Sequence, residues 1–172
     1  MKQFLLGFVI GLILLPACAY LYFRFGYAPV ATASSPMIFE RRLAGMALKA
    51  RIEKEAPKNV PIQATNDNLM AGAHLYRKDC AGCHGLPGQP DDPIAKGMFP
   101  KPPQLFKGHG VTDDPAGETY WKVTNGIRMT GMPAYSDSLK DDERWQVSLM
   151  LANADKLSPD VQAVLNQPLE VH

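Results

Sequence analysis

Two cysteines stand three positions apart in this chain, and a histidine directly follows the second, in the C-A-G-C-H sequence of residues 80–84. Few kinds of site accept this spacing. A thioredoxin-like pair would lie beside a strand and a helix, yet no strand candidate precedes Cys80. A disulfide closed across this spacing on a helix would be strained. A zinc site would need two more soft ligands. The chain offers no second cysteine pair, and its other histidines are His74, His109 and His172.

The interpretation that remains is covalent attachment of haem. The thiols of Cys80 and Cys83 can reach the two vinyl groups on one side of a porphyrin, and His84 is then carried beneath the ring, where its imidazole can ligate iron. Residues 85–116 are dense in Gly, Pro and Asp and show no persistent periodicity. A loop of that length counts against a compact fold unless it wraps something. We therefore predict one covalently attached haem c.

A second axial ligand to the iron is expected from a methionine. Pro133 restricts the preceding Met132 to an extended conformation and stiffens its loop, while Gly126 and Gly131 let the backbone pass close to the ring. Met132 is therefore the predicted ligand, and Met129 is expected to pack beneath the loop. A histidine ligand or an open site is the alternative. Further candidates are Met98, His74 and His109. Histidine–methionine ligation raises the reduction potential of haem, as suits a carrier late in an electron-transfer chain.

The N-terminus carries an uncharged run over residues 4–23, between Lys2 and Arg24. At 1.5 Å per residue, a helix of this length reaches about 30 Å, enough to cross a bilayer core. We predict a retained transmembrane helix with its N-terminus in the cytoplasm. A signal peptide cleaved after residues 17–19 is one alternative. A lipoprotein modified at Cys18 is another, although the proline before it and the apolar residues after it disfavour this.

Four further segments predict helices. Residues 28–36 read as a small-residue linker, and residues 37–55 as a stem helix that packs outside the domain or lays basic side chains on lipid or a partner. Asn66 or Asp67 can cap a helix that runs to Cys80. Residues 118–125 form a short helix closed by Gly126, and Asp141 starts a last helix that ends before Pro159. We expect no strands.

Charge is unevenly distributed along the chain. The formal net charge is +1, which gives no electrostatic reason to expect nucleic acid as a partner. Residues 24–63 carry seven Lys/Arg against three Glu, whereas residues 64–158 carry ten Lys/Arg against twelve Asp/Glu. The basic segment therefore joins the apolar N-terminus to the rest.

Four stretches in the order LMAGAHLYRKDCAGCHG, FPKPPQL, YWKVTNGIRMTGMPAY and ERWQ resemble the class I cytochrome c family, over about residues 65–157. The resemblance implies an all-α fold of about three to five helices around one covalent haem. It also implies that the first and last helices of the domain cross at right angles near Gly72, with Tyr76 and Trp145 packing around the crossing.

The resemblance extends to the surroundings of the haem. The carbonyl of Pro103 should accept the second N–H of His84, which would orient the ring, and Leu105 should pack on the porphyrin. Asn125 is expected to brace the methionine loop. Three positions should approach the propionates or, alternatively, serve as ordinary boundary packing: Tyr120, Trp121 and Arg128.

These expectations define a function and a domain plan. The chain should be a non-enzymatic electron carrier with no organic substrate, anchored by a single pass in a bacterial inner membrane with its haem domain in the periplasm. A haem subunit of an oxidoreductase complex and a gas or redox sensor are the alternatives. Expected partners are a quinol-oxidising complex, a dehydrogenase or a terminal oxidase. The predicted segments are an anchor at 1–27, a linker and stem at 28–63, the cytochrome domain at 64–158 and a tail at 159–172.

Overall fold

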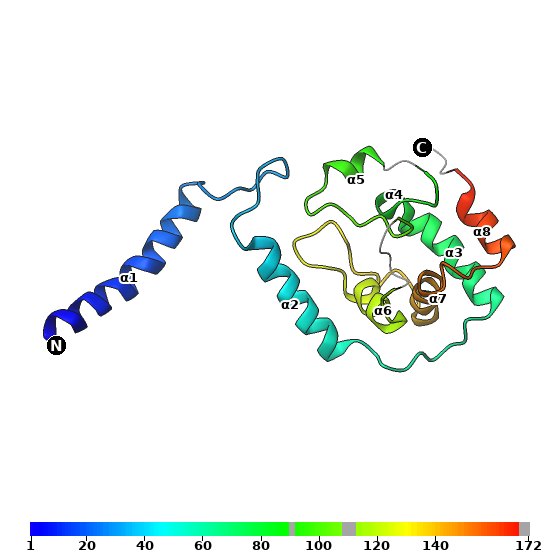
Figure 1. The fold of residues 1–172 in the computed structure, drawn as a ribbon, viewed down its shortest axis with the longest axis horizontal. Coiled ribbons are helices and arrows are strands. Elements are labelled where there is room, and N and C mark those ends of the chain that lie inside the picture. Colours follow the sequence, from blue (N-terminus) through cyan, green and yellow to red (C-terminus); the bar gives the residue numbers. More distant parts are fainter. Residues whose placement is uncertain (90–91, 108–112, 169–172) are drawn as a thin grey trace. The chain divides into compact units, whose positions relative to one another are not determined.

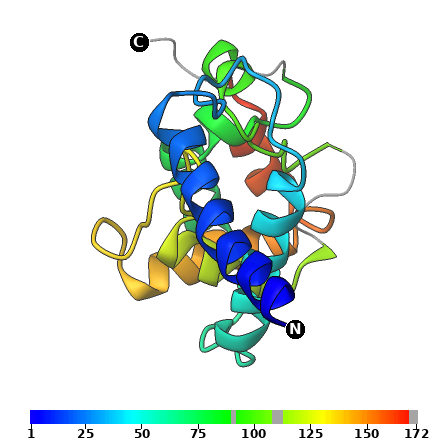
Figure 2. The same ribbon diagram turned by 90° about the vertical axis from the view of Figure 1, so that its left-hand side faces the viewer.

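The computed structural model describes residues 1–89, 92–107 and 113–168. The chain divides into two compact units, Met1–Leu43 and Ala44–His172. Every regular element in the described ranges is a helix, as Figures 1 and 2 show from two sides. The all-α prediction is therefore confirmed.

The N-terminal unit begins with α1 (Lys2–Arg24), which contains Pro16 and in which no residue is buried. Its most apolar 18-residue window has a mean hydropathy of 2.4. By length and composition α1 can cross a membrane, a criterion that a signal sequence near the N-terminus also meets. The ring of Tyr22, in the last turn of the helix, stacks on the ring of Tyr27 just beyond it, with centroids 6.3 Å apart.

Helix α2 (Glu40–Glu55) begins three residues later than predicted. Phe39 has a φ of 69°, in the left-handed region, so the right-handed helix cannot include it. The carboxylate of Glu40 instead accepts the backbone N–H of Met37 at 2.8 Å. The apolar side chains whose spacing predicted this helix, including Leu43 and Met46, are exposed.

The core of the second unit is the crossing of α3 (Asn66–Asp79) and α7 (Asp141–Ala152). A Cβ at Gly72 would overlap the carbonyl oxygen of Gln146 and come within 2.8 Å of Met150 Cβ. The crossing near Gly72 is therefore present. The predicted cap of α3 is wrong by one residue, because the Thr65 hydroxyl, rather than Asn66 or Asp67, accepts the N–H of Asn68.

Helix α6 (Ala116–Asn125) packs on α7 and ends, as predicted, at Gly126, which has a φ of 64°. Trp145 is buried, but it stacks on Tyr120 of α6, with ring centroids 4.1 Å apart. The edge of the Tyr76 ring instead meets Phe106 at 5.2 Å. Tyr76 and Trp145, which were expected to pack around the crossing, are thus both buried in the crossing helices and have separate aromatic partners.

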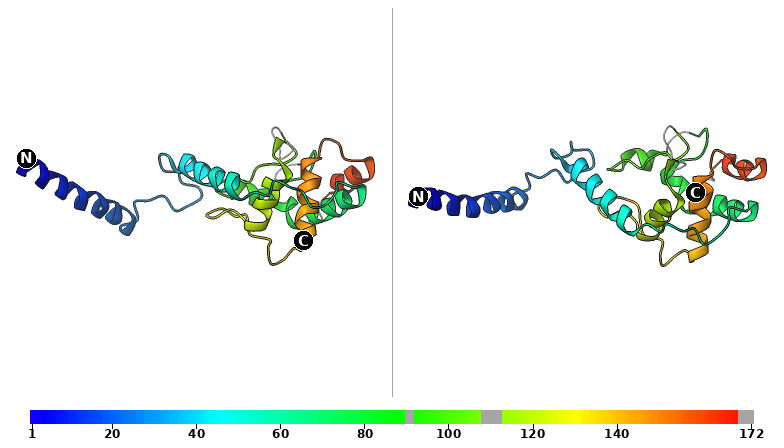
Figure 3. Two further views of the ribbon diagram at one scale, coloured as in Figure 1. Left: turned by 90° about the horizontal axis from the view of Figure 1, so that it is seen from below. Right: turned by 60° about the horizontal axis from the view of Figure 1, so that its bottom comes forward.

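Helix α8 (Pro159–Asn166) lies where the sequence indicates only a tail. Val161 and Leu165 are fully buried, and α8 packs along α3 (Figure 3). Asn66 donates to Asp160 at 2.9 Å, and Arg77 donates to the carbonyl oxygens of Gln167 and Pro168. The chain after α7 therefore completes the core.

Two short helices interrupt the loop region. Helix α4 (Ala81–His84) is a single turn inside the cysteine motif. Helix α5 (Pro93–Gly97) lies within the predicted loop 85–116, and the Asp92 carboxylate caps it by accepting the N–H of Ile94 at 2.7 Å.

Candidate haem-binding site

The cysteine motif occupies the junction of α3 and α4. Cys80 ends α3, with its N–H bonded to the Tyr76 carbonyl, and its own carbonyl accepts the N–H groups of Cys83 and His84 at 3.1 and 2.9 Å. Both cysteines are half-buried and free of disulfides. Burial first, and then the nearby Asp79 and Cys83, raise the pKa of Cys80 to about 12. An unmodified Cys80 therefore remains a thiol at neutral pH.

His84 is held in one orientation. Its Nδ1 donates to the carbonyl oxygen of Pro103 at 2.9 Å, the hydrogen bond that the resemblance implies. Burial lowers the pKa of His84, against the opposing effect of that hydrogen bond. A neutral imidazole with its proton on Nδ1 keeps the lone pair of Nε2 available, which is the form that ligates a metal.

Gln104 and Leu105 form hydrogen bonds to the backbone of the cysteine motif and so fix its conformation. The N–H of Leu105 donates to the His84 carbonyl at 3.2 Å, and the Gln104 side-chain amide donates to the Cys83 carbonyl at 3.1 Å. The side-chain oxygen of Gln104 occupies the space of a Cβ on Gly85, whose φ is 75°. Position 85 therefore requires glycine for two reasons: its backbone is in the left-handed region, and the Gln104 side chain leaves no room for a Cβ. The sequence analysis did not identify Gln104.

The methionine loop is braced by Thr130. Its hydroxyl donates to the Ile127 carbonyl at 2.7 Å and accepts the N–H of Met132 at 3.1 Å, while the N–H of Ile127 donates to the Met132 carbonyl at 3.2 Å. Met132 is half-buried and packs against the core. The side chain of Met129 is 91% exposed, so it does not pack beneath the loop as predicted. Its φ of 60° places it in a tight turn.

Tyr135 joins the methionine loop to the cysteine motif. Its hydroxyl donates to the Asp79 carbonyl at 2.8 Å. Burial first, and then the proximity of Cys80, Asp79 and Cys83, raise the pKa of Tyr135 to about 12. The two segments that should carry the axial ligands therefore meet, although they lie some 50 residues apart in sequence.

A second tyrosine also contacts the cysteine motif. The Tyr76 hydroxyl donates to the Gly85 carbonyl at 2.7 Å. The hydrogen bonds of Tyr135 and Tyr76 could not be predicted from a sequence pattern.

The other predicted site residues have ordinary protein contacts. Leu105 packs against the core, the Tyr120 hydroxyl donates to Asp141 at 2.5 Å, and Trp121 donates to Glu55 at 3.1 Å. These contacts match the boundary-packing alternative for the two aromatic residues. Arg128 is exposed.

The hydrogen bond that the structure shows for Asn125 is not the expected brace of the methionine loop. Its side-chain amide donates to the carbonyl of Trp121, within its own helix, at 2.9 Å. Of the other candidate axial ligands, His74 is exposed and Met98 packs against Gly131. His109 and His172 lie outside the described residues.

The assembled residues fit a covalently bound haem. Two thiols lie on one helical turn, a neutral imidazole follows, and a thioether comes from a braced loop. The half-buried Leu105, Phe106 and Met132 all pack against the core that contains Tyr76 and Ala81. Porphyrin attachment and His–Met ligation require this donor set. Within the described ranges, no three His, Cys, Asp or Glu side chains converge in a way that would hold a bare metal ion.

Comparisons with known proteins agree with this chemistry. Residues 67–149 match the family model described as cytochrome c oxidase, cbb3-type, subunit III. Quinohemoprotein alcohol dehydrogenase ADH IIB of Pseudomonas putida is 27% identical over 97 residues, which are 55% of this chain and 12% of that protein. The chain thus spans about an eighth of this relative's length.

A solved structure is also similar. The reducing HAO-like protein complex of Kuenenia stuttgartiensis contains a chain with 28% identity and a TM-score of 0.46, and the match covers 58% of this chain and 51% of that one. The family match and the alcohol dehydrogenase both point to haem proteins of redox metabolism. The chain therefore contains a cytochrome c domain, which spans residues 67–149 and whose function is haem-based electron transfer.

Proposed function

We propose that this chain is a membrane-anchored monohaem cytochrome c that carries single electrons between redox proteins outside the cytoplasm. The observation that carries the proposal is that the Tyr135 hydroxyl, just after the methionine loop, donates to the Asp79 carbonyl just before the cysteine motif. This bond joins the turn in which the Pro103 carbonyl orients His84 to the loop in which Thr130 braces the half-buried Met132. When bound, the haem supplies a one-electron Fe(III)/Fe(II) couple.

The residues of the chain have separate tasks in this function. Cys80 and Cys83 form the thioether bonds, so the cofactor cannot dissociate. Pro103 accepts the Nδ1 proton of His84 and leaves Nε2 for the iron. Thr130 accepts the backbone N–H of Met132 and would thereby keep the thioether in place as the second iron ligand. With His84 and Met132 both bound to the iron, no open position would remain there for a substrate, so the proposed role of the chain itself is electron carriage rather than catalysis.

The proposed location follows from α1. A single pass through a bacterial inner membrane, with the N-terminus inside, places the haem domain in the periplasm, where covalent haem attachment takes place according to the family resemblance. In this plan residues 1–27 are the anchor, 28–63 the linker and stem, and 64–158 the cytochrome domain, to which α8 adds part of the segment 159–172.

A quinol-oxidising complex, a dehydrogenase or a terminal oxidase is the proposed partner class. The alternative is a haem subunit within an oxidoreductase complex. It is favoured by one observation, that the similar region of the alcohol dehydrogenase is a small part of a much longer chain.

Redox titration of the full-length holoprotein tests the carrier function. We expect one reversible one-electron transition, because a single haem with two protein ligands has one couple. Carbon monoxide added to the reduced protein should leave its absorption spectrum unchanged, since Met132 fills the sixth position. A spectrum that shifts on addition of carbon monoxide would show an open site and favour the gas-sensor alternative, and several transitions would exclude a monohaem carrier.

A further inference from the structure

Helix α2 carries apolar side chains on two opposite faces. The inner stripe, at i, i+4 and i+8, consists of Leu48, Ile52 and Ala56, which are half-buried or buried. The outer stripe contains the exposed residues Leu43, Met46, Ala47 and Ala50. On a helix with 100° between residues, Ile52 lies about 180° from Leu43. The outer stripe therefore faces away from whatever the inner stripe contacts.

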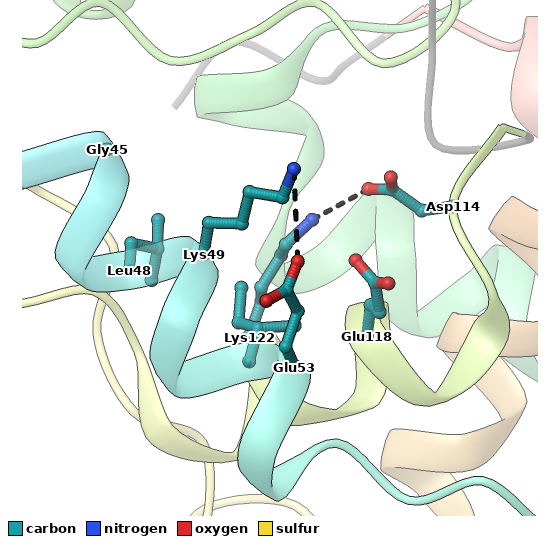
Figure 4. A pocket seen from close by; sticks show the side chains of 8 residues that line it. Gly45, Leu48, Lys49, Glu53, Asp114, Glu118 and Lys122 are labelled. Carbon is teal, nitrogen blue, oxygen red and sulfur yellow. Dashed lines mark hydrogen bonds and ion pairs between the residues drawn. The ribbon is translucent and has the colours of Figure 1, made fainter. Parts of the chain in front are cut away.

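The inner stripe is attached to the cytochrome domain. Ile52 and Ala56 are 4% and 7% exposed, and a Cβ at Gly117 of α6 would overlap the carbonyl of Pro57. Trp121 of α6 adds its hydrogen bond to Glu55. A cavity of about 310 Å³ lies between the two helices, as Figure 4 shows.

Two ion pairs lie at this cavity, which Glu118 also lines. The ammonium of Lys122 contacts the Asp114 carboxylate at 2.6 Å, and Lys49 approaches Glu53 at 3.8 Å (Figure 4). On the inner side of α2, Ile52 and Ala56 are thus buried beside an open cavity, whereas the side chains of the outer stripe are exposed.

The exposed apolar residues of the chain are concentrated near α1. After that helix, ten large apolar side chains are exposed in the described residues, and seven of them fall between positions 25 and 46. These seven are Phe25, Tyr27, Val30, Ile38, Phe39, Leu43 and Met46. These residues follow the candidate span in sequence, which favours lipid over a soluble partner, because the membrane interface accepts apolar and aromatic side chains that flank a span.

The charges of α2 are complementary to an anionic lipid surface. The helix carries five Lys/Arg against three Glu. Arg42 and Lys54 each lie one helical turn from a residue of the outer stripe and so border it. Arg51 also borders the stripe, but it is paired with Glu55 at 2.8 Å. Each basic side chain near an anionic surface contributes about 1 kcal/mol to membrane binding, and their long alkyl chains let the charged ends reach the headgroups.

We propose that the outer stripe of α2 lies in the headgroup region of the membrane that α1 spans. The proposal rests on the membrane anchoring of the proposed function. The inner stripe then holds the cytochrome domain against the bilayer, so that the haem stays within reach of membrane-bound redox partners. Confinement to the surface raises the effective concentration of the carrier toward such partners.

Nitroxide labels on the full-length holoprotein test this placement. The protein, with Cys18→Ala as background, is reconstituted in nanodiscs of phosphatidylcholine and phosphatidylglycerol and labelled at Met46→Cys or Ala50→Cys. Collision with oxygen, which concentrates in lipid, is compared with collision with a polar nickel chelate. Ala163→Cys, an exposed alanine on α8, is the matched control, and Leu12→Cys in α1 reports on the anchor.

We expect the labels at positions 46 and 50 to collide more with oxygen than with the chelate, as at position 12, and the label at 163 to show the reverse. Removal of phosphatidylglycerol should reduce this preference at 46 and not at 12. Preference for the chelate at 46 and 50 would overturn the proposal, as would exclusion of both reagents, which indicates a second copy or another protein on the stripe. A water-exposed label at 12 would instead show that the anchoring itself fails.

Discussion

Replacement of Met132 by alanine should abolish the thioether-to-iron charge-transfer band of the oxidised protein and lower its reduction potential. The methyl side chain of alanine cannot ligate iron, and loss of the thioether removes the ligand that raises the potential. Thr130 and Ile127 would still shape the loop through backbone contacts. The spectral loss should therefore be complete while the protein stays folded, which absorption spectroscopy and a redox titration can measure together.

Met129→Ala is the matched control for this substitution. The Met129 side chain is exposed, whereas that of Met132 packs against the core. We expect the Met129 variant to keep both the band and the potential. If the band survives in Met132→Ala and disappears in Met129→Ala, the ligand assignment is wrong.

A second large effect is expected at the crossing of α3 and α7. Gly72→Ala would place a methyl group against the carbonyl of Gln146 and Met150 Cβ, and both belong to a packed helix that cannot move without opening the core. Overpacking of this kind costs about 1–3 kcal/mol. We expect the free energy of unfolding to fall by about 3 kcal/mol, since the contact includes rigid backbone. Denaturant titration followed by circular dichroism measures the change.

Gly45→Ala provides the comparison within the same chain. Gly45 is also inside a helix, and a Cβ there meets nothing within 4 Å. Alanine should therefore stabilise this position, by up to about 1 kcal/mol. Equal stability of the two variants would show that the α3–α7 contact is looser than the structure indicates.

The parts of the fold that depend on local patterns could be predicted from the sequence. The cysteine motif, the glycine that closes α6 and the acidic start of α7 each have a local physical cause, and each lies where predicted. The hydrogen bond from His84 to Pro103 was also expected, because the family resemblance supplied a long-range pairing that no local rule contains.

The parts that depend on tertiary contacts could not be predicted. The periodicity of α2 identified a helix, but the stripe that indicated it is the exposed one, since burial depends on the position of α6. Helix α8 is too short to be recognised before its contacts with α3 are known. Tyr135 and Gln104 act through backbone carbonyls far away in sequence, and a side chain that bonds to a carbonyl leaves no motif.

The account depends most on the covalent haem. Intact-mass measurement of the full-length chain, expressed in a host that attaches haem c, tests it most directly when the denatured protein is also stained for haem. We predict a mass increase equal to one haem, retained on denaturation and lost when Cys80 and Cys83 are both replaced by alanine. A polypeptide without covalent haem, or with more than one, would contradict the account.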